Sequence, residues 1–428
     1  MPNAASPPLQ YDYLVVGGGA AGLSLAYYLA QEPRLAGQRA LLIEPASKNQ
    51  NDRTWSYWAT ETGPFDHLAR GRWHNIAFRA PGFERVLALG AYQYYSIRGL
   101  DFYRFVHAVL AANPQQFIQQ QGEVVELLET ADGVEARLAD GRRYHARYAF
   151  DSRPPAIERR PRKHRYLLQH FVGWEIETTR DAFDPAVVEF MDFRGEQQQE
   201  ARFIYVLPFG PRRALVEYTL FSAQPLPKAE YEAHILQYLQ EVKQLQPADY
   251  QVVETEAGAI PMSDHPLPAC AGQRIINLGT RGGRAKPSTG YAFRRIQAQS
   301  VRLVAALATT GRLPADPTGD RWQFQLFDTL LLDIMQRRGE RTRDIFRQLF
   351  ERNPVERILQ FLDEKTTWAD NLRILNSVSA GPFLRSIWQV LRGRVGQRHR
   401  SWRQLATAAP APSAVAAPVA AAALHEQQ

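Results

Sequence analysis

The 428-residue chain has a single cysteine, Cys270, so no internal disulfide is possible. No histidine-containing motif surrounds this cysteine, and we expect a small buried side chain there rather than a nucleophile. Its first ten residues lack a basic, apolar secretory signal. Residues 13–30 carry no charge, but their four glycines favour a strand–turn–helix unit over a membrane span. We find no internal repeat, expect no metal site and predict a cytoplasmic protein.

Acidic residues are absent from residues 371–404, which contain seven arginines. Nucleic acid is one possible partner of such a basic segment. An apolar helical face beside the arginines favours an anionic membrane surface instead, and its residues are Phe383, Leu384, Ile387, Trp388, Leu391 and Val395. The alternative is a purely structural helix that packs on the core and has a basic outer face. We expect no binding of nucleic acid.

A glycine motif with the spacing G-x-G-x-x-G lies close to the N-terminus. The apolar segment Tyr11–Val16 precedes it, and Leu23–Leu29 follows with helical character. Gly17 permits a tight turn, Gly19 lets the backbone approach a pyrophosphate, and Gly22 allows close packing of helix and strand. The order of these features predicts a Rossmann-type dinucleotide site at the N-terminus of a helix.

An acidic residue stands where the second strand of such a unit would end. The apolar run Ala40–Ile43 is followed by Glu44, whose carboxylate can accept hydrogen bonds from ribose hydroxyl groups. Arg53 follows in a short polar loop and is a candidate for binding phosphate or the edge of a flavin. Trp55, Tyr57 and Trp58 are candidates for an apolar substrate pocket, or alternatively for anchoring this loop to the core.

A second glycine-rich loop follows the predicted strand Ile275–Leu278 and begins at Gly279. Pro287, Ser288 and Thr289 are typical of the first residues of a helix, and Gly290 follows them. Two such segments indicate a two-part site for FAD, whereas NAD alone would need only the first. The alternative is a helix cap without a ligand.

Glu217 stands within the apolar run Leu215–Leu220. Strand alternation places Leu215, Glu217 and Thr219 on one face and Val216, Tyr218 and Leu220 on the other. Glu217 is therefore either on the solvated side of an edge strand or held in a pocket. In a pocket, burial would raise the pKa of the carboxyl and make it available as a general acid.

These patterns predict an α/β fold with a discontinuous FAD-binding domain formed by residues 11–75, 117–165 and 253–310. A β-rich substrate domain is expected over residues 76–116 and 166–252. Residues 311–404 are expected to be helical and to dock on a membrane. A flexible arm (1–10) and a disordered Ala/Pro tail (405–428) complete the expected organisation.

Taken together, these segments resemble the flavin-dependent lycopene β-cyclases of carotenoid-making bacteria over nearly the whole ordered chain. The resemblance rests on eight segments in order: Val16–Gly22, Asn51–Trp55, Gln169–Phe171, Met191–Arg194, Tyr205–Phe209, Val216–Thr219, Ile260–Met262 and Lys286–Tyr291. Bacterial members often have Cys-Phe where this chain has Ser56-Tyr57, so no thiol role is assigned there.

The resemblance implies cyclisation of the linear ψ-ends of lycopene to β-ionone rings, giving γ-carotene and then β-carotene without net redox change. It implies that FAD acts in its reduced form, with NAD(P)H as the reductant. It also implies Glu217 as the acid and base, and His170 and Asp192 are weaker candidates for a proton relay. Lycopene resides in the bilayer, so we expect peripheral association with the inner face of the cell membrane.

Two other hypotheses stay open at this point. An FAD-dependent monooxygenase or reductase of an isoprenoid or aromatic substrate would share the nucleotide motifs. Those enzymes commonly have Gly-Asp after the late strand, whereas Gly279 is followed by Thr280. A non-catalytic, membrane-associated flavin-binding protein is the third possibility.

Overall fold

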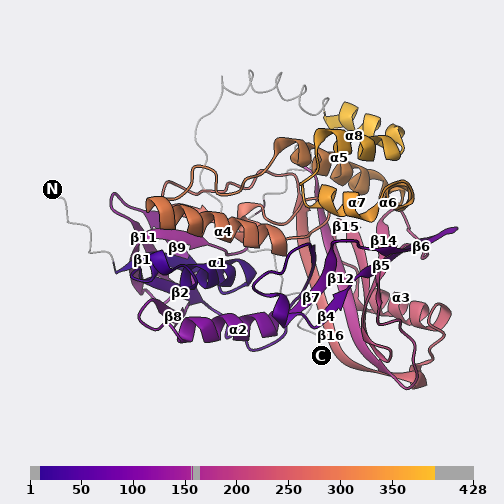
Figure 1. Ribbon diagram of the computed structural model, residues 1–428, viewed down its shortest axis with the longest axis horizontal. Helices are drawn as coiled ribbons and strands as arrows, with labels where there is room; N and C mark the ends of the chain where they lie inside the picture. Colours follow the sequence, from indigo (N-terminus) through magenta and orange to yellow (C-terminus); the bar gives the residue numbers. More distant parts are fainter. Residues whose placement is uncertain (1–9, 156, 158–163, 391–428) are drawn as a thin grey trace.

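The computed structural model describes residues 10–155, 157 and 164–390. A nucleotide-binding type of sheet with its helices lies at one end of the molecule, and a large, mostly antiparallel sheet lies at the other (Figure 1). Helices α5 to α8 lie above the large sheet, and α3 lies below it (Figure 1). The expected α/β architecture with a helical C-terminal region is confirmed.

The first sheet has the order β8-β2-β1-β11-β10-β9, and β17 also pairs with β11. Strand β1 lies between β2 and β11 and is parallel to both. The elements of this unit are β1 (Tyr11–Val16), α1 (Ala20–Ala30), β2 (Ala40–Glu44), β8 (Phe117–Gln121), β9 (Val124–Glu129), β10 (Val134–Leu138), β11 (Arg143–Asp151), β17 (Ile275–Asn277) and α4 (Phe293–Thr310). Strands β10 and β11 pair in antiparallel fashion and are joined through Asp140 and Gly141, where Gly141 has a φ of +88°.

The second sheet has the order β16-β12-β15-β14-β13-β5-β6. Its elements are β5 (Asn75–Ala80), β6 (Phe83–Ala88), β12 (Tyr166–Thr178), β13 (Val187–Asp192), β14 (Ala201–Gly210), β15 (Arg213–Ser222), β16 (Tyr250–Ser263) and the covering helix α3 (Lys228–Glu241). A three-stranded sheet joins the two units and consists of β3 (Thr54–Ala59), β4 (Gly71–Trp73) and β7 (Gln93–Arg98).

Two segments lie outside the units expected from the sequence. Strand β16 pairs with β12 along its whole length: Ser263 is opposite Tyr166 at one end, and Tyr250 is opposite Thr178 at the other. Residues 253–263 therefore belong to the large sheet. Helix α2 (Gly99–Ala111) shares a core with α1, because Phe102 and Leu110 are buried in the same apolar cluster as Leu25. Burial of these apolar side chains places α2 with the nucleotide unit rather than with the substrate sheet.

The C-terminal helices are α5 (Trp322–Arg338), α6 (Arg341–Arg352), α7 (Val355–Leu362) and α8 (Trp368–Ser377), and residues 380–390 are also helical. Phe346 and Phe350 of α6 pack on the large sheet. Within the described residues, no helix combines the length and the apolar character needed to cross a bilayer. The N-terminal arm, the Ala/Pro tail, Leu391 and Val395 lie outside the described residues.

Candidate active site

The three motif glycines have different surroundings. Gly17 has a φ of +98°, and a Cβ there would lie 2.3 Å from Ser152 Oγ. A Cβ on Gly22 would lie 1.9 Å from the carbonyl oxygen of Gly17, so only glycine fits at this contact of helix and strand. A Cβ on Gly19 would meet no atom within 4 Å. Gly19 therefore borders open space at the start of α1, where no side chain of the described residues caps the helix.

Glu44 lies at the end of β2, beside the glycine motif. The backbone N–H of Gly18 donates to Glu44 Oε2, and the N–H of Ala46 donates to Oε1 at 3.0 Å. Arg53 is exposed in the loop before β3, and its carbonyl oxygen accepts a hydrogen bond of 2.7 Å from Gly99 N. The acidic residue thus stands next to the open space beside Gly19 where a nucleotide would lie.

The second glycine-rich segment meets the first. Gly279 has a φ of +56°, and a Cβ there would lie 2.7 Å from Ala21 Cβ in α1. The prediction that Pro287, Ser288 and Thr289 begin the following helix is wrong, because α4 begins at Phe293. Ser288 Oγ instead donates to Asp328 Oδ1 of α5 at 2.6 Å, so its hydroxyl is not available as a cap.

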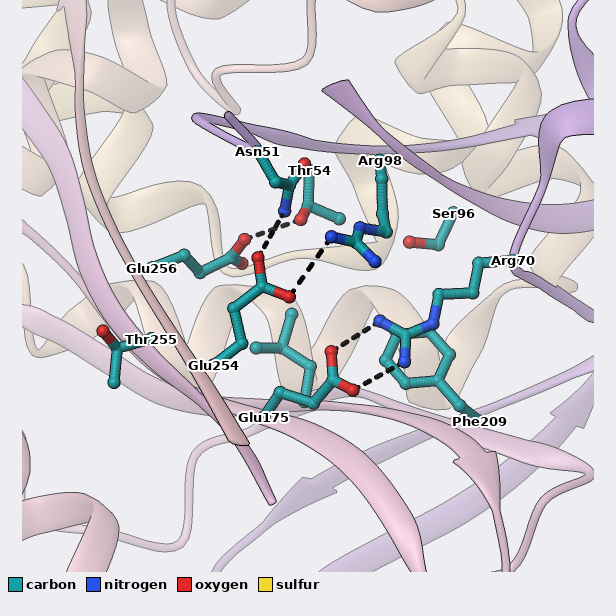
Figure 2. A pocket seen from close by; sticks show the side chains of 11 residues that line it. Asn51, Thr54, Arg70, Ser96, Arg98, Glu175, Phe209, Glu254, Thr255 and Glu256 are labelled. Atoms are coloured by element: carbon teal, nitrogen blue, oxygen red, sulfur yellow. Dashed lines mark hydrogen bonds and ion pairs between the residues drawn. The ribbon is translucent and has the colours of Figure 1, made fainter. Parts of the chain in front are cut away.

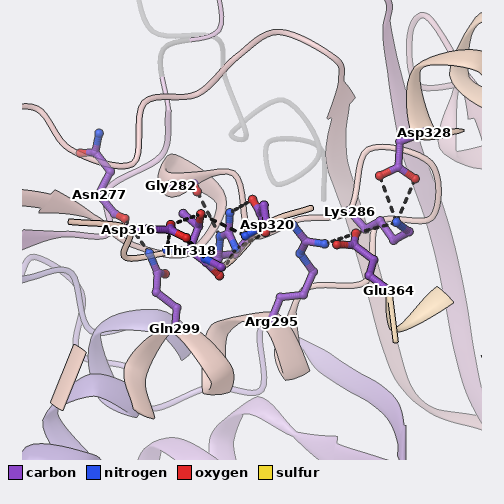
Figure 3. Close-up of polar contacts among 12 residues, drawn as sticks. Asn277, Gly282, Lys286, Arg295, Gln299, Asp316, Thr318, Asp320, Asp328 and Glu364 are labelled. Atoms are coloured by element: carbon purple, nitrogen blue, oxygen red, sulfur yellow. Dashed lines mark hydrogen bonds and ion pairs between the residues drawn. The ribbon is translucent and has the colours of Figure 1, made fainter. Parts of the chain in front are cut away.

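The loop after β17 is fixed by buried ion pairs with the C-terminal helical region (Figure 3). Lys286 Nζ donates to Asp328 Oδ2 at 3.0 Å and to Glu364 Oε1 at 2.8 Å. Arg295 of α4 also pairs with Glu364, and Asp320 pairs with both Arg284 and Arg295. The position of the loop is therefore tied to α5 and to the segment after α7.

Gly290 ends this loop against the large sheet. It has a φ of +72°, and a Cβ there would lie 2.1 Å from Gln169 Oε1 on β12. The oxygens Gln169 Oε1 and Thr289 Oγ1 are buried without a hydrogen-bond partner among the described residues. Orphaned buried acceptors of this kind mark a place where a polar ligand can bind.

Glu217 lies in β15 on the face of the sheet that is directed toward the nucleotide unit. It is 9% exposed, so the interpretation that it occupies a solvated face is wrong. The predicted alternation is confirmed, because Leu215 and Val216 belong to different apolar clusters. Burial, reinforced by the Glu256 carboxyl, raises the pKa of Glu217 to about 8, whereas a hydrogen bond from Thr219 opposes this rise.

Tyrosine side chains surround the Glu217 carboxyl. Tyr205 is its cross-strand partner on β14, and the hydroxyl groups of Tyr205 and Tyr94 are 2.8 Å apart. Tyr291 follows Gly290 in the second glycine-rich segment. Burial, Tyr94 and the Glu217 carboxyl raise the pKa of Tyr291 well above its usual range. Glu217 is thus close to the loop that the sequence assigned to the flavin.

Trp55, Tyr57 and Trp58, the candidates for an apolar pocket, lie in β3 but do not share one face of the strand. Trp55 and Tyr57 stack on Phe293 of α4, with ring centroids at 5.6 and 4.9 Å. Trp58 points the other way and contacts Tyr291 edge-on at 4.7 Å. Only Trp58 therefore lies on the side of Glu217, and Trp55 and Tyr57 have the contacts of core residues.

His170 and Asp192 lie away from Glu217. His170 Nδ1 is 2.6 Å from the hydroxyl of Tyr231 on α3, and Nε2 is 2.8 Å from Ser222 Oγ. Burial and the charge of Arg202 lower the pKa of His170 to about 4, so the ring is neutral at pH 7. Asp192 accepts hydrogen bonds from Arg194. Their expected part in a proton relay does not agree with this placement.

The sequence analysis missed a second carboxyl, Glu256 of β16. It borders a small polar cavity of about 20 Å³, which is also lined by Asn51, Thr54, Arg98 and Glu254 (Figure 2). Thr54 Oγ1 donates to Glu256 Oε2 at 2.6 Å. Every second residue from Glu254 to Ile260 faces this side, and that alternation was the available signal.

Comparison with known proteins agrees with this geometry. Residues 12–387 match the family described as lycopene cyclase protein. This chain belongs to the lycopene cyclase family. It is 30% identical over 393 residues to a lycopene beta-cyclase of a Paracoccus strain, covering 86% of this chain and 94% of that one. It is 26% identical over 417 residues to the lycopene beta-cyclase of Pantoea ananas, covering 89% of this chain and 98% of the relative.

Solved structures resemble this lycopene cyclase family member in fold. Klebsiella pneumoniae HpxO in complex with FAD and uric acid has a TM-score of 0.59 at 17% identity, covering 87% of this chain and 98% of that one. A geranylgeranyl bacteriochlorophyll reductase-like protein from Thermoplasma acidophilum has a TM-score of 0.54 at 15% identity, covering 90% and 99%. These likenesses establish the fold, which this chain shares with an enzyme solved in complex with FAD.

Proposed function

We propose that the protein is a lycopene β-cyclase in which Glu217 is the acid and base. The observation that carries this proposal is a buried carboxyl with a raised pKa, surrounded by tyrosines and without a contacting cation among the described residues. Such a group stays protonated at neutral pH and can donate to a substrate without hydrogen-bonding groups. The family membership of the chain supports lycopene as this substrate.

The reaction balances without an oxidant. The Glu217 proton adds to the C1–C2 double bond of the linear end and leaves a tertiary cation at C1. The C5–C6 double bond attacks this cation to close the ring, and the proton on C6 returns to the Glu217 carboxylate. Aromatic faces stabilise a carbocation, and Trp58, Tyr205 and Tyr291 lie on the side of the sheet where this cation would form.

The nucleotide-side residues fit FAD. Gly19 leaves open space at an uncapped helix start, where a pyrophosphate would be held, and Glu44 is placed to accept hydrogen bonds from the ribose. Arg53, Gly279, Pro287, Ser288, Thr289 and Gly290 remain proposed contacts. When bound in its reduced form, with NAD(P)H as the electron source, FAD would supply an electron-rich surface that stabilises positive charge.

Flavin content tests this assignment. Gly19→Val places a branched side chain where the pyrophosphate would lie, without any contact to the chain itself. We expect a folded protein that purifies without flavin absorbance, whereas Gly37→Val, also at a glycine whose Cβ would meet nothing within 4 Å, keeps the flavin. A Gly19→Val protein with stoichiometric flavin contradicts the proposal.

Pigment analysis tests the reaction itself. Expression in cells that accumulate lycopene should yield β-carotene, and the purified enzyme with reduced FAD should cyclise lycopene in the absence of oxygen. The alternative, an FAD-dependent monooxygenase or reductase, is favoured only by the shared fold. Oxygen consumption coupled to substrate turnover would support that alternative and contradict a cyclase.

We also propose that the helical region docks on the inner face of the cell membrane to collect lycopene. Exposed tryptophan and long aliphatic side chains gather on the C-terminal helices and are Trp322, Leu326, Trp368, Leu372, Leu384, Ile387 and Trp388. Exposed large apolar residues elsewhere in the described chain are mostly valines. Phe383, expected on the same face, packs toward the core instead. Interfacial tryptophans favour the boundary between lipid and water.

Vesicle flotation tests the docking. Trp322 and Trp368 are 66% and 53% exposed, with ring centroids 6.1 Å apart. Replacing both with serine should weaken binding to anionic vesicles by roughly thirtyfold, because the loss of each ring removes about 1 kcal/mol of interfacial contact. The matched control replaces the exposed pair Val252 and Val253 on β16 with serine. Equal binding of both variants contradicts docking through this surface.

A further inference from the structure

Glu217 and Glu256 stand on either side of a glycine in one row across the large sheet. Gly173 of β12 is the register partner of Glu217 on β15 and also of Glu256 on β16. Partners in adjacent strands direct their side chains to the same face. The two carboxylic side chains therefore share a face and are separated by a residue without a side chain.

Both glutamate side chains and Leu215 border the space above Gly173. A Cβ on Gly173 would lie 3.0 Å from Leu215 Cδ1, 3.3 Å from Glu256 Cγ and 3.5 Å from Glu217 Cβ. Strands two positions apart are separated by about 10 Å at the backbone. The Glu256 side chain thus leans over the glycine toward Glu217, and the other side chain among the atoms nearest to that position is the uncharged Leu215.

The two carboxyls differ in what stabilises their charged forms. Glu256 accepts a hydrogen bond of 2.6 Å from Thr54 Oγ1 and borders the polar cavity, which has room for one water molecule. Arg98 stands at the same cavity, 3.4 Å from Glu254. Glu217 has Thr219 and the surrounding tyrosines. Glu256 therefore loses its proton first, and the resulting negative charge faces Glu217.

We propose that Glu256 is a positioning residue that keeps the Glu217 carboxyl protonated at neutral pH. This inference rests on the proposed role of Glu217 as the acid. When two carboxyls share a site, ionisation of one opposes ionisation of the other. Burial raises the pKa of Glu256 to about 7, against the hydrogen bond from Thr54, and raises that of Glu217 further. The pair thus shares one proton near neutral pH, and the hydrogen bond from Thr54 to Glu256 favours Glu217 as the protonated member.

Other titratable groups among the described residues also face the Glu217–Glu256 pair. Tyr205 and Tyr291 face Glu217 from β14 and from the loop after β17. The groups that act on Glu256 come from β16, β12 and β7, and they are Glu254, Glu175 and Arg98. Glu175 is itself paired with Arg70 and Arg213. Glu256 is therefore the like charge that acts on Glu217.

Infrared titration of the full-length, flavin-loaded enzyme tests the proposal without any turnover. The C=O band of the protonated Glu217 carboxyl is assigned by its loss in Glu217→Gln. In Glu256→Gln the midpoint for loss of this band should fall by about one pH unit, because the facing charge is removed. An unchanged midpoint overturns the proposal, even if the enzyme cyclises lycopene.

Turnover gives a second readout. The alkaline limit of kcat should move down with the infrared midpoint in Glu256→Gln, while kcat below that limit is largely kept, and Glu256→Asp should restore part of the shift. A merely structural role would lower kcat equally at every pH and would contradict the proposal. Glu177→Gln, at an exposed position of β12, is the matched control and should change neither readout.

Thr54→Val keeps the proposal testable if Glu256→Gln does not fold. Removing the hydroxyl destabilises the charged form of Glu256, so the midpoint of the Glu217 band should shift in the same direction as in Glu256→Gln and by less. If no variant cyclises lycopene while the infrared midpoints shift as expected, the proposed function fails and the carboxyl pair stands.

Discussion

Ionisable side chains on the two faces of the large sheet differ in whether they have partners that satisfy them. On the face that α3 covers, His170 has hydrogen-bond partners on both ring nitrogens. Asp192, at the end of β13, is matched by Arg194. On the face toward the nucleotide unit, Glu217 is buried with a hydroxyl donor and a second carboxyl nearby. Buried charges are ordinarily paired, so an unpaired one marks a functional position.

Glu175, another carboxyl on the nucleotide-facing side, makes the comparison sharper. Glu175 is only two residues from Gly173 on β12 and is equally buried. Burial alone would raise its pKa, but hydrogen bonds from Arg70 and Arg213 bring the pKa of Glu175 below its usual value. The contacting arginines therefore account for the opposite direction at Glu175. Without such a cation among its described neighbours, Glu217 keeps the rise in pKa that burial and the Glu256 carboxyl cause.

The largest expected effect comes from removing the proposed acid. Glu217→Gln keeps the shape and the hydrogen bond from Thr219 but has no proton to donate. We expect lycopene cyclisation to fall by about 10³-fold or more, while flavin content stays unchanged. Product formation measured by pigment chromatography checks this. Normal production of β-carotene by the variant would remove Glu217 from the reaction.

Asp192→Asn should affect stability instead of chemistry. The change removes one of two carboxylates that pair with the Arg194 guanidinium and leaves Glu84 as the other. We expect a loss of roughly 2 kcal/mol in the free energy of unfolding, measured by urea denaturation. The kcat per folded molecule should stay within about twofold of the parent. A large fall in kcat without loss of stability would return Asp192 to the proton relay.

Tyr231→Phe should give a smaller loss of folding stability than Asp192→Asn. The hydroxyl of Tyr231 is hydrogen-bonded to His170 Nδ1 and accepts from Leu226 N at 3.0 Å. Leaving these buried groups unsatisfied costs about 1–2 kcal/mol of folding stability. Because His170 lies under α3, the pH profile of cyclisation should not move. A shifted profile would show that His170 exchanges protons with the reaction.

Local patterns were enough to predict the nucleotide unit. The glycine motif, the strand before it and Glu44 lie within 34 residues of the chain, from Tyr11 to Glu44, and each follows from short-range backbone geometry. The face of Glu217 also followed from alternation within one strand. Its burial did not, because burial depends on the helices and strands that cover the sheet.

The remaining features of the site depend on contacts between distant segments. Glu256 faces Glu217 only because β12 lies between β15 and β16, and sheet order is not written in any single strand. Ser288 fails as a helix cap because Asp328, 40 residues further on, binds its hydroxyl. His170 and Gly173 are on opposite faces by alternation, but the sequence alone did not show which face the flavin segments approach.

The pH dependence of stability should separate Glu217 from Glu175 by its sign. The pKa of Glu217 is raised to about 8 in the folded protein, well above the ordinary value of a glutamate carboxyl, so the folded state retains a proton that the unfolded chain releases. Stability is therefore lost as pH rises between these values, and Glu217→Gln should raise Tm more at pH 8 than at pH 5. The pKa of Glu175 is lowered, so its contribution is present above its unfolded pKa and is lost in acid. Glu175→Gln should consequently lower Tm more at pH 7 than at pH 4, as measured by thermal melts. Parallel pH slopes for the two variants would mean that cationic partners do not distinguish these carboxyls.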